Sequence, residues 1–553
     1  MMKVVALQIL LLFLSTMASA CLNSEFVFHL KTPECKPESW QQYPLLGDAT
    51  IDTLQAGFNG GHFTSVDLVK AYLKRIEEVD SLNPVIETNP DALAIAAELD
   101  AERSAGIIRG PLHGIPILIK ENIATNDKMN TTSGSYALLG AKVPRDSTVA
   151  RKLRDSGAVI LGKSNLSQWA NFRSVDTTNG WSSMGGQTYG PYYPGQDPSG
   201  SSSGSAVASA LGLALGCLGT ETDGSILSPS SKNSIVGIKP TLGLTSRDLV
   251  IPISERQDTI GPMTRTVKDA AFILQAIAGV DPYDNYTSAI PNNGVVPDYV
   301  SACQLSALSG ARIGISRNMM ELRAVKTQFP AFEKAISVIK AAGATIIDNI
   351  DFPSAAEYLD SGVKDLIIQA DFPVNLASYL SQLTENPNNV TTLAEVREFT
   401  RSSNDEEFPG RDTALWDRIL FEQAWDNTDP RFWDAYQRTL YYNGEGGLLG
   451  AIDRLNLDAV ISPSDGTHTF AAGVGAPVIT VPLGFSAPDT AVVRNSRDLV
   501  TAGPNLPFGI SFMGAKFTEA KLIGLAYAFE QKTHTRGEGK MYISPNTKLV
   551  DVL

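Results

Sequence analysis

A lysine ends one of the most apolar stretches of the sequence. Residues 117–119 read Ile-Leu-Ile and Lys120 follows directly, so the pattern predicts a buried strand with an ammonium group at its end. A lysine is rarely fully buried without a partner or a task. Burial lowers the pKa of a lysine, and the neutral amine can then act as a general base. Taken alone, the position favours the plainer alternative of a surface lysine at a strand end.

A loop rich in Gly and Ser, residues 198–206, offers a cluster of hydroxyl groups ahead of an Ala- and Leu-rich stretch that predicts a helix. A flexible linker does not fit, because apolar segments flank the loop closely. A Walker-type phosphate loop does not fit either, because no Gly-Lys-Ser/Thr follows.

A second small-residue segment runs from Gly219 to Ile226. Such a turn can direct successive backbone N–H groups to one point, which is the geometry of an oxyanion hole. We expect Ser225 to be a nucleophile at the end of this turn, although the segment lacks the Gly-x-Ser-x-Gly elbow. A hydroxyl nucleophile needs a base within hydrogen-bond reach. Lys120 and the hydroxyl-rich loop could supply that base as a relay without histidine.

Short apolar runs that alternate with amphipathic stretches predict the elements that position these residues. Strands are expected at 114–119, 158–161, 312–315, 344–347, 459–461 and 478–481, and helices at 147–156 and 518–531. A capping box at Thr64–Asp67 predicts one earlier helix, and Pro90 at a first helical position predicts another. Apolar strands alternating with helices indicate a layered α/β fold with helices on both faces of the sheet.

Taken together, Lys120, the Gly/Ser loop and residues 219–225 resemble the amidase signature family of serine hydrolases. The separation of Ser201 and Ser225 is the one that the family has. The similarity continues through four further segments, at 236–241, 257–263, 475–484 and 525–530. It therefore covers about residues 48–533, and the right order of these motifs makes it specific.

The resemblance implies a fold, a site and a reaction. The family fold is a single α/β/α domain around a large mixed, twisted sheet. By position, Ser225 corresponds to the acylated nucleophile, Ser201 to a middle serine that follows a cis peptide bond from Gly200, and Lys120 to the general base. The oxyanion hole corresponds to the backbone N–H groups of Thr222, Asp223, Gly224 and Ser225. The family uses no metal or cofactor, and its substrates are small-molecule or peptide amides.

Three departures from the family pattern bear on the substrate. Glu221 replaces an Asp, Asp223 a Gly and Leu227 an Arg. The side chain of Asp223 must then point away from a forming oxyanion. Loss of the Arg removes a cation that could hold a substrate carboxylate, which argues against glutamine and small acidic amides. The Glu-Thr-Asp-Gly-Ser-Ile form is most similar to the peptide amidase subgroup, whose members remove the C-terminal amide of peptides.

Alternative functions are a fatty-acid amide hydrolase, a non-hydrolytic secreted protein on the same scaffold, and an esterase that depends on His113 or His468. The first alternative rests on residues 408–442, whose aromatic side chains could line an acyl channel, although helix packing or an oligomer face also explains them. The nine aromatics are Phe408, Trp416, Phe421, Trp425, Phe432, Trp433, Tyr436, Tyr441 and Tyr442.

The first twenty residues have the form of a secretory signal, with Lys3, an apolar run at 4–13 and a small-residue cleavage site at 18–20. The apolar run is too short to span about 30 Å as a membrane anchor. A lipoprotein acylated at Cys21 is a third interpretation. We expect a secreted chain with an extension at 21–47, an amidase domain at 48–533 and a tail at 534–553. Secretion argues against the tRNA amidotransferase branch of the family.

Composition and cysteines agree with an extracellular enzyme. The net charge of −14 disfavours a nucleic-acid partner, and the five His form no zinc-type cluster. Cys21 and Cys35 are a plausible disulfide, whereas Cys217 lies in an apolar run and predicts an inert buried thiol. Sequons stand at Asn130, Asn165, Asn285 and Asn389, of which the last two lie in polar loops and are the better glycan sites. The oligomeric state is left open.

Overall fold

The computed structural model describes residues 43–322, 326–466 and 468–553. The expected signal peptide at 1–20, the Cys21–Cys35 pair and residues 21–42 of the expected extension lie outside the described residues. Residues 43–553 form one compact unit.

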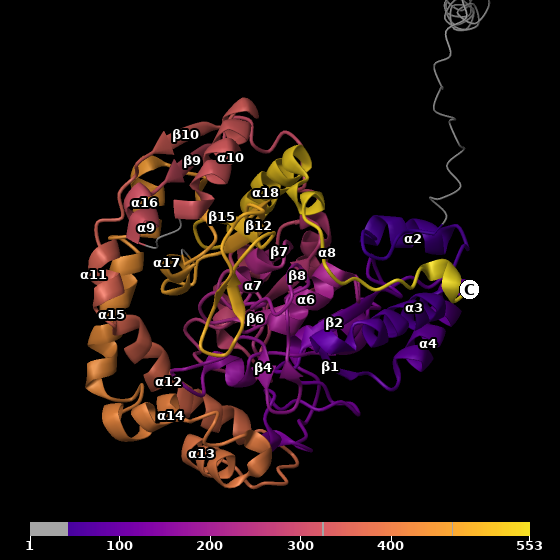
Figure 1. Ribbon diagram of the computed structural model, residues 1–553, viewed down its shortest axis with the longest axis horizontal. Coiled ribbons are helices and arrows are strands. Elements are labelled where there is room, and N and C mark those ends of the chain that lie inside the picture. The colour runs from indigo at the N-terminus through magenta and orange to yellow at the C-terminus, as the bar shows by residue number, and fades with distance from the viewer. Residues whose placement is uncertain (1–42, 323–325, 467) are drawn as a thin grey trace, which may run out of the picture. The chain divides into compact units, whose positions relative to one another are not determined.

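Within the described residues, a sheet of eleven strands runs through this unit (Figure 1). From one edge to the other the strands are β1 (Val85–Thr88), β3 (Val159–Ser164), β2 (Pro116–Lys120), β6 (Gly216–Glu221), β8 (Thr259–Thr264), β7 (Val236–Lys239), β12 (Val478–Phe485), β15 (Pro507–Met513), β11 (Ala459–Pro463), β9 (Arg312–Ile315) and β10 (Thr345–Asp348). Two small hairpins pair β4 (Trp181–Ser182) with β5 (Gly186–Gln187), and β13 (Val493–Arg494) with β14 (Val500–Ala502).

The large sheet is mixed, as the resemblance implied. β2 runs parallel to β3 and β6, and β9 runs parallel to β10 and β11. The remaining neighbours are antiparallel. Lys120 is the last residue of β2, which lies between β3 and β6, so its side chain emerges from the interior of the sheet rather than from an edge.

All six predicted strands are present, as β2, β3, β9, β10, β11 and β12. The sequence pattern missed β1, β6, β7, β8 and β15. Several of these contain Gly or Pro, which indicate breaks in a strand when they are interpreted locally. Gly261 in β8 explains one case, because a Cβ there would lie 1.9 Å from the carbonyl oxygen of Ile238 in β7. Close approach of two backbones demands a glycine at that point.

The helices cover the sheet and its ends. They are α2 (Ile51–Asn59), α3 (Ser65–Glu78), α4 (Ala92–Ser104), α5 (Thr148–Asp155), α6 (Ser203–Leu211), α7 (Leu227–Lys232), α8 (Val267–Ile277), α9 (Arg317–Leu322), α10 (Phe329–Ala341), α11 (Ala355–Asp360), α12 (Val363–Leu380), α13 (Leu393–Ser402), α14 (Ala414–Asp417), α15 (Pro430–Asn443), α16 (Leu448–Leu455), α17 (Thr469–Ala472) and α18 (Glu519–Thr533). The predicted helices at 147–156 and 518–531 are confirmed as α5 and α18.

The two predicted helix starts had different outcomes. The Thr64–Asp67 capping box is present at the start of α3. The prediction that Pro90 occupies a first helical position is wrong, because α4 begins at Ala92. The side-chain oxygen of Asn89 accepts a hydrogen bond from the N–H of Asp91 at 2.9 Å, so Asn89 and Pro90 form a turn before the helix.

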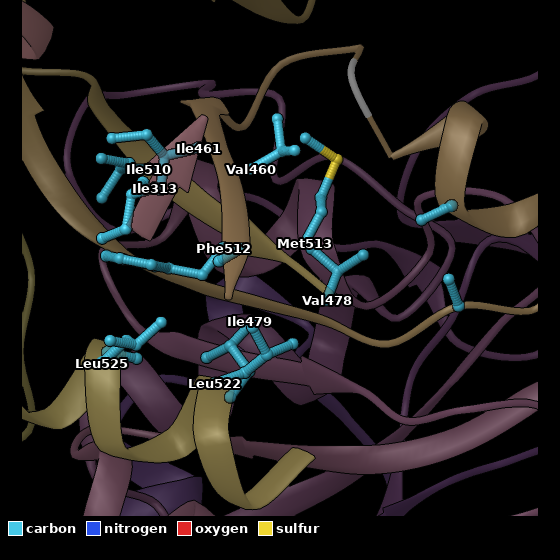
Figure 2. Close-up of a cluster of buried hydrophobic side chains, with 14 of the residues drawn as sticks. Ile313, Val460, Ile461, Val478, Ile479, Ile510, Phe512, Met513, Leu522 and Leu525 are labelled. Atoms are coloured by element: carbon cyan, nitrogen blue, oxygen red, sulfur yellow. The ribbon is translucent and has the colours of Figure 1, made fainter. Parts of the chain in front are cut away.

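Two large hydrophobic clusters hold the sheet to its helices. Around β11, β12 and β15, side chains such as Ile479, Ile510 and Phe512 contact Leu522 and Leu525 of α18 (Figure 2). A second cluster joins β2 and β3 to α3, α4 and α5. Lys120 therefore ends a strand whose neighbours on both faces are packed hydrocarbon.

The aromatic segment at 408–442 is partly buried and partly exposed. Trp416, Phe432 and Tyr442 are buried, whereas Phe421, Trp433 and Tyr441 are exposed. The indole N–H of Trp416 donates to the carbonyl oxygen of Phe172 at 2.6 Å. Helix packing thus accounts for the buried members of the segment.

Candidate active site

Lys120 is fully buried, and its amine lies among hydroxyl groups. Its Nζ donates to Ser201 Oγ at 2.8 Å and to Thr220 Oγ1 at 2.9 Å. Burial lowers the pKa of Lys120 to about 7, although the negative charges of Asp258 and Glu221 partly offset this effect. The amine is therefore close to the balance between its neutral and charged forms near pH 7.

Ser201 follows a cis peptide bond from Gly200, which confirms the expectation that the family resemblance carried. The serine is buried and lies just ahead of α6. Its neighbour Ser202 donates its backbone N–H to the carbonyl oxygen of Ser225 at 3.1 Å. The Gly/Ser loop and the 219–226 segment, which are separate in sequence, are thus joined by a backbone hydrogen bond beside both serines.

The turn from 221 to 227 is held by one buried carboxylate. Oε2 of Glu221 accepts the N–H of Ile226 at 2.7 Å and the N–H of Leu227 at 2.9 Å, at the start of α7. Gly224 has φ of +90°, a left-handed conformation that favours glycine. Ser225 is only partly buried.

The side chain of Asp223 is bound by groups from two distant segments. Oδ1 contacts His468 Nδ1 at 2.7 Å, and Oδ2 accepts from Lys364 Nζ at 2.7 Å and from Thr469 Oγ1 at 3.1 Å. Burial raises the pKa of Asp223, but the charges of Lys364 and His468 outweigh burial and hold the pKa well below its usual range. The carboxylate is thus ionised, and both of its oxygens are bound by these partners.

A cavity of about 340 Å³ adjoins this region. Thr220 and Thr222 line one wall, and Asn375 and Tyr379 of α12 line another. Neither Ser201 nor Ser225 is among the lining residues, so the cavity lies beside the reacting groups rather than at them. None of the nine aromatics of 408–442 lines it.

Asp258 is one of several acids that line this cavity. It accepts a hydrogen bond from Thr222 Oγ1 at 2.5 Å and one from the N–H of Ile253 at 2.7 Å. Burial raises the pKa of Asp258 to about 6, although these hydrogen bonds oppose the shift. Asp258 thus fixes the side chain of the first residue in the expected oxyanion turn.

Sequence reasoning identified the lysine and both serines but missed their partners. Thr220 and Asp258 lie inside the quoted motifs, so a closer look at polar residues there could have found them. Lys364 carries no local signal, because α12 is far from the motifs in sequence. His468 was considered only as a catalytic base for an esterase, and its contact with Asp223 was not anticipated.

Two further sequence predictions concern a cysteine and a histidine. Cys217 is fully buried, and burial raises the pKa of its thiol to about 12, as expected of an inert cysteine. His113 is also buried, with Nε2 2.9 Å from the carbonyl oxygen of Leu99, and contacts none of the residues above.

In the part of the chain that the structure describes, no cluster of His, Cys, Asp and Glu could hold a metal ion. A search of that same part found no helix long and apolar enough to cross a membrane.

Comparisons with known proteins find a family match and several similar proteins. A family described as Amidase matches residues 67–523. A protein of Arthroderma benhamiae named "Putative amidase" is 52% identical, over 92% of this chain and 90% of its own. The native peptide amidase of Stenotrophomonas maltophilia has a similar structure, with a TM-score of 0.79, 37% identity, and coverage of 90% of this chain and 99% of its own. An amidase family protein of Bacillus anthracis gives a TM-score of 0.79, 32% identity, and coverage of 89% and 92%.

Proposed function

The chain belongs to the amidase signature family and is an amide-hydrolysing enzyme, and from this premise we propose that Lys120, Ser201 and Ser225 form its catalytic triad. The observation that carries the proposal is the 2.8 Å hydrogen bond between Lys120 Nζ and Ser201 Oγ. A lysine with a pKa of about 7 can accept the proton that Ser201 must pass on.

The reaction proceeds in two halves. Ser225 Oγ attacks the amide carbonyl, its proton passes to Ser201, and Ser201 passes its own proton to neutral Lys120. The proton returns by the same route to the leaving nitrogen, which departs as ammonia or an amine and leaves an ester between the acyl group and Ser225. Water then hydrolyses this acyl-enzyme through the reverse relay and restores the free serine.

The backbone N–H groups of Thr222, Asp223, Gly224 and Ser225 stabilise the oxyanion that forms in each half. The buried carboxylate of Glu221 supports this role, because it accepts the next two N–H groups along the chain and so fixes the end of the turn. Removing a donor from such a hole typically costs about 3–4 kcal/mol of transition-state stabilisation.

We propose peptides with a C-terminal amide as the substrate class. The similarity to the Stenotrophomonas peptide amidase supports this choice, as does Leu227, which removes a cation next to Ser225. A fatty-acid amide hydrolase gains less support, because none of the 408–442 aromatics on which it rests lines the cavity beside the site.

Ser225→Ala, Ser201→Ala and Lys120→Ala test the triad on a peptide amide and on the matching ester. Ser225→Ala should abolish labelling by a fluorophosphonate, while Ser201→Ala should leave Ser225 present but slow. Lys120→Ala should depress amide hydrolysis more than ester hydrolysis, because an ester's leaving group needs less help from a proton.

Lys152→Ala is the control for loss of a lysine. The Nζ of Lys152 donates to the carbonyl oxygen of Ala278 at 2.8 Å and contacts none of the proposed catalytic residues, so both activities should persist. Near-normal amide turnover in Lys120→Ala across pH 6–9 would show the triad to be wrong. Loss of activity in His468→Ala with Lys120→Ala unaffected would instead indicate a histidine-dependent esterase.

We also propose that the enzyme is secreted and glycosylated at Asn285 and Asn389. Both side chains are exposed, whereas Asn165 is buried and its Nδ2 donates to Thr188 Oγ1 at 3.0 Å. Intact-mass analysis of protein from the culture medium of a eukaryotic host tests this proposal. We expect a chain that begins near Cys21 and carries glycan mass, and retention of residues 1–20 or an unmodified mass would count against it.

A further inference from the structure

The negative charge of Asp223 is unfavourable in an oxyanion turn. Its backbone N–H is one of the proposed donors, and its carboxylate is attached to the same residue. A full negative charge so close to a forming oxyanion opposes the charge that the turn exists to stabilise. The usual glycine of the family brings no such charge, so this chain must offset it.

Lys364 and His468 supply the offset from outside the motif-bearing segments. Lys364 lies in the first turn of α12, and its Nζ is 2.7 Å from Asp223 Oδ2. His468 stands just before α17, with its Nδ1 2.7 Å from Asp223 Oδ1. Thr469 completes the set with a hydrogen bond of 3.1 Å to Oδ2. The carboxylate therefore meets a cation, an imidazole and a hydroxyl.

The same contacts fix the backbone. A Cβ built on Gly224 would lie 2.6 Å from Cε1 of His468, so the imidazole ring packs directly against the residue before Ser225. α12 is itself anchored two turns beyond Lys364, where Asp371 Oδ2 accepts from Ser254 Oγ at 2.6 Å. Lys364 thus projects from a helix that is held in place independently of Asp223.

We propose that Lys364 and His468 are positioning residues for the oxyanion turn: Lys364 neutralises Asp223, and both hold its carboxylate away from the oxyanion while its N–H faces it. The inference rests on the proposed function, because it presumes that this turn is the oxyanion hole. It goes further, because it assigns roles to two residues outside the motifs. It also states that the charge of Asp223 requires a partner.

The decisive test is whether removing the acid rescues removal of the lysine. Lys364→Met removes the cation beside the Asp223 carboxylate and should lower kcat for a peptide amide by about tenfold or more, with a smaller change in KM. Asp223→Asn combined with Lys364→Met removes both charges and should restore kcat to within about threefold of Asp223→Asn alone. A merely structural role would leave the double variant as slow as the single variant, or slower.

Further variants keep the test decisive. Lys364→Arg retains the cation and should keep most of kcat, and Lys364→Gln repeats the test if Lys364→Met does not fold. His468→Gln should lower kcat but retain fluorophosphonate labelling of Ser225. Lys521→Met removes the lysine of a surface pair, 3.2 Å from Asp458, and should change neither parameter.

The outcomes separate this inference from the proposed function. Equal kcat in Lys364→Met and the double variant, or wild-type kcat in Lys364→Met, would overturn the positioning role while the Ser225→Ala and Lys120→Ala results stand. Unchanged amide turnover in Ser225→Ala would overturn the proposed function itself.

Discussion

Lys120 is fully buried and has two hydroxyl partners. These surroundings set the pH range in which the enzyme should work. The hydroxyls of Ser201 and Thr220 offer dipoles but no opposing charge, so they do not compensate fully for the lost hydration of an ammonium group. The pKa near 7 is the consequence. Burial also lowers the pKa of Lys163, and the neighbouring charge of Glu121 opposes that shift.

We predict that kcat/KM for a peptide amide rises with pH up to about 7 and then levels off. The proposed base is the neutral form of Lys120, which is the minor species below its pKa, so activity should fall about tenfold per pH unit in that range. A profile from pH 5 to 9 measures this dependence, and a flat profile between pH 5.5 and 8 would contradict it.

At the level of helices and strands, the buried carboxylate of Glu406 joins three segments of the chain. These segments lie on the side of the site that faces α13 and α14. Oε1 of Glu406 accepts from Ser135 Oγ at 2.6 Å, and Oε2 accepts from Gln168 Nε2 at 2.8 Å and from Arg173 Nη1 at 3.0 Å. Gln168 lies one residue from Ser167, whose N–H donates to the carbonyl oxygen of Ser201. The ion pair therefore supports the backbone around the middle serine.

We predict that Glu406→Gln lowers the free energy of unfolding by about 3–5 kcal/mol, because it leaves the buried Arg173 guanidinium without its counter-charge. Glu407→Gln is the matched control. Its carboxylate is exposed and lies 3.7 Å from Arg411, so a change of at most about 1 kcal/mol is expected. Urea denaturation of both variants gives the comparison, and equal losses would refute the special role of the buried pair.

At the scale of the whole molecule, the C-terminal residues return to the N-terminal helices. Figure 1 shows the end of the chain beside α3. Arg75 Nη1 donates to the carbonyl oxygen of Thr547 at 2.8 Å, and Glu78 accepts from the N–H of the same residue at 3.1 Å. Leu549 is buried in the cluster that includes α3 and β2.

We predict that deletion of residues 545–553 lowers the free energy of unfolding by at least about 2 kcal/mol. Loss of the buried side chain of Leu549 alone costs about that much. Arg75 would lose carbonyl partners as well. Deletion of Leu553 alone, which is exposed, should have no measurable effect. Urea denaturation is again the measurement, and an unchanged midpoint and slope in the longer deletion would contradict the prediction.

Local sequence patterns were enough to predict the chemistry of the site and the most apolar parts of the scaffold. Continuous hydrocarbon runs such as 117–119 predict buried strands, because their side chains have no favourable exposed arrangement. The family resemblance carried by the small-residue motifs implied which serines belong together and that a cis bond follows Gly200. Strands with internal Gly or Pro, such as β8, escaped detection because their pairing depends on partners elsewhere in the chain.

The distant side chains that complete the site could be identified from the folded chain but not from local sequence. Lys120 on its own favoured a surface position, and its pKa near 7 follows from packing on both faces of β2, which no local window contains. Lys364 and His468 reach Asp223 from segments more than a hundred residues away, 141 and 245 positions along the chain. Such contacts form when helices and strands pack, and their residue types carry no periodic signal, so local sequence patterns cannot reveal them.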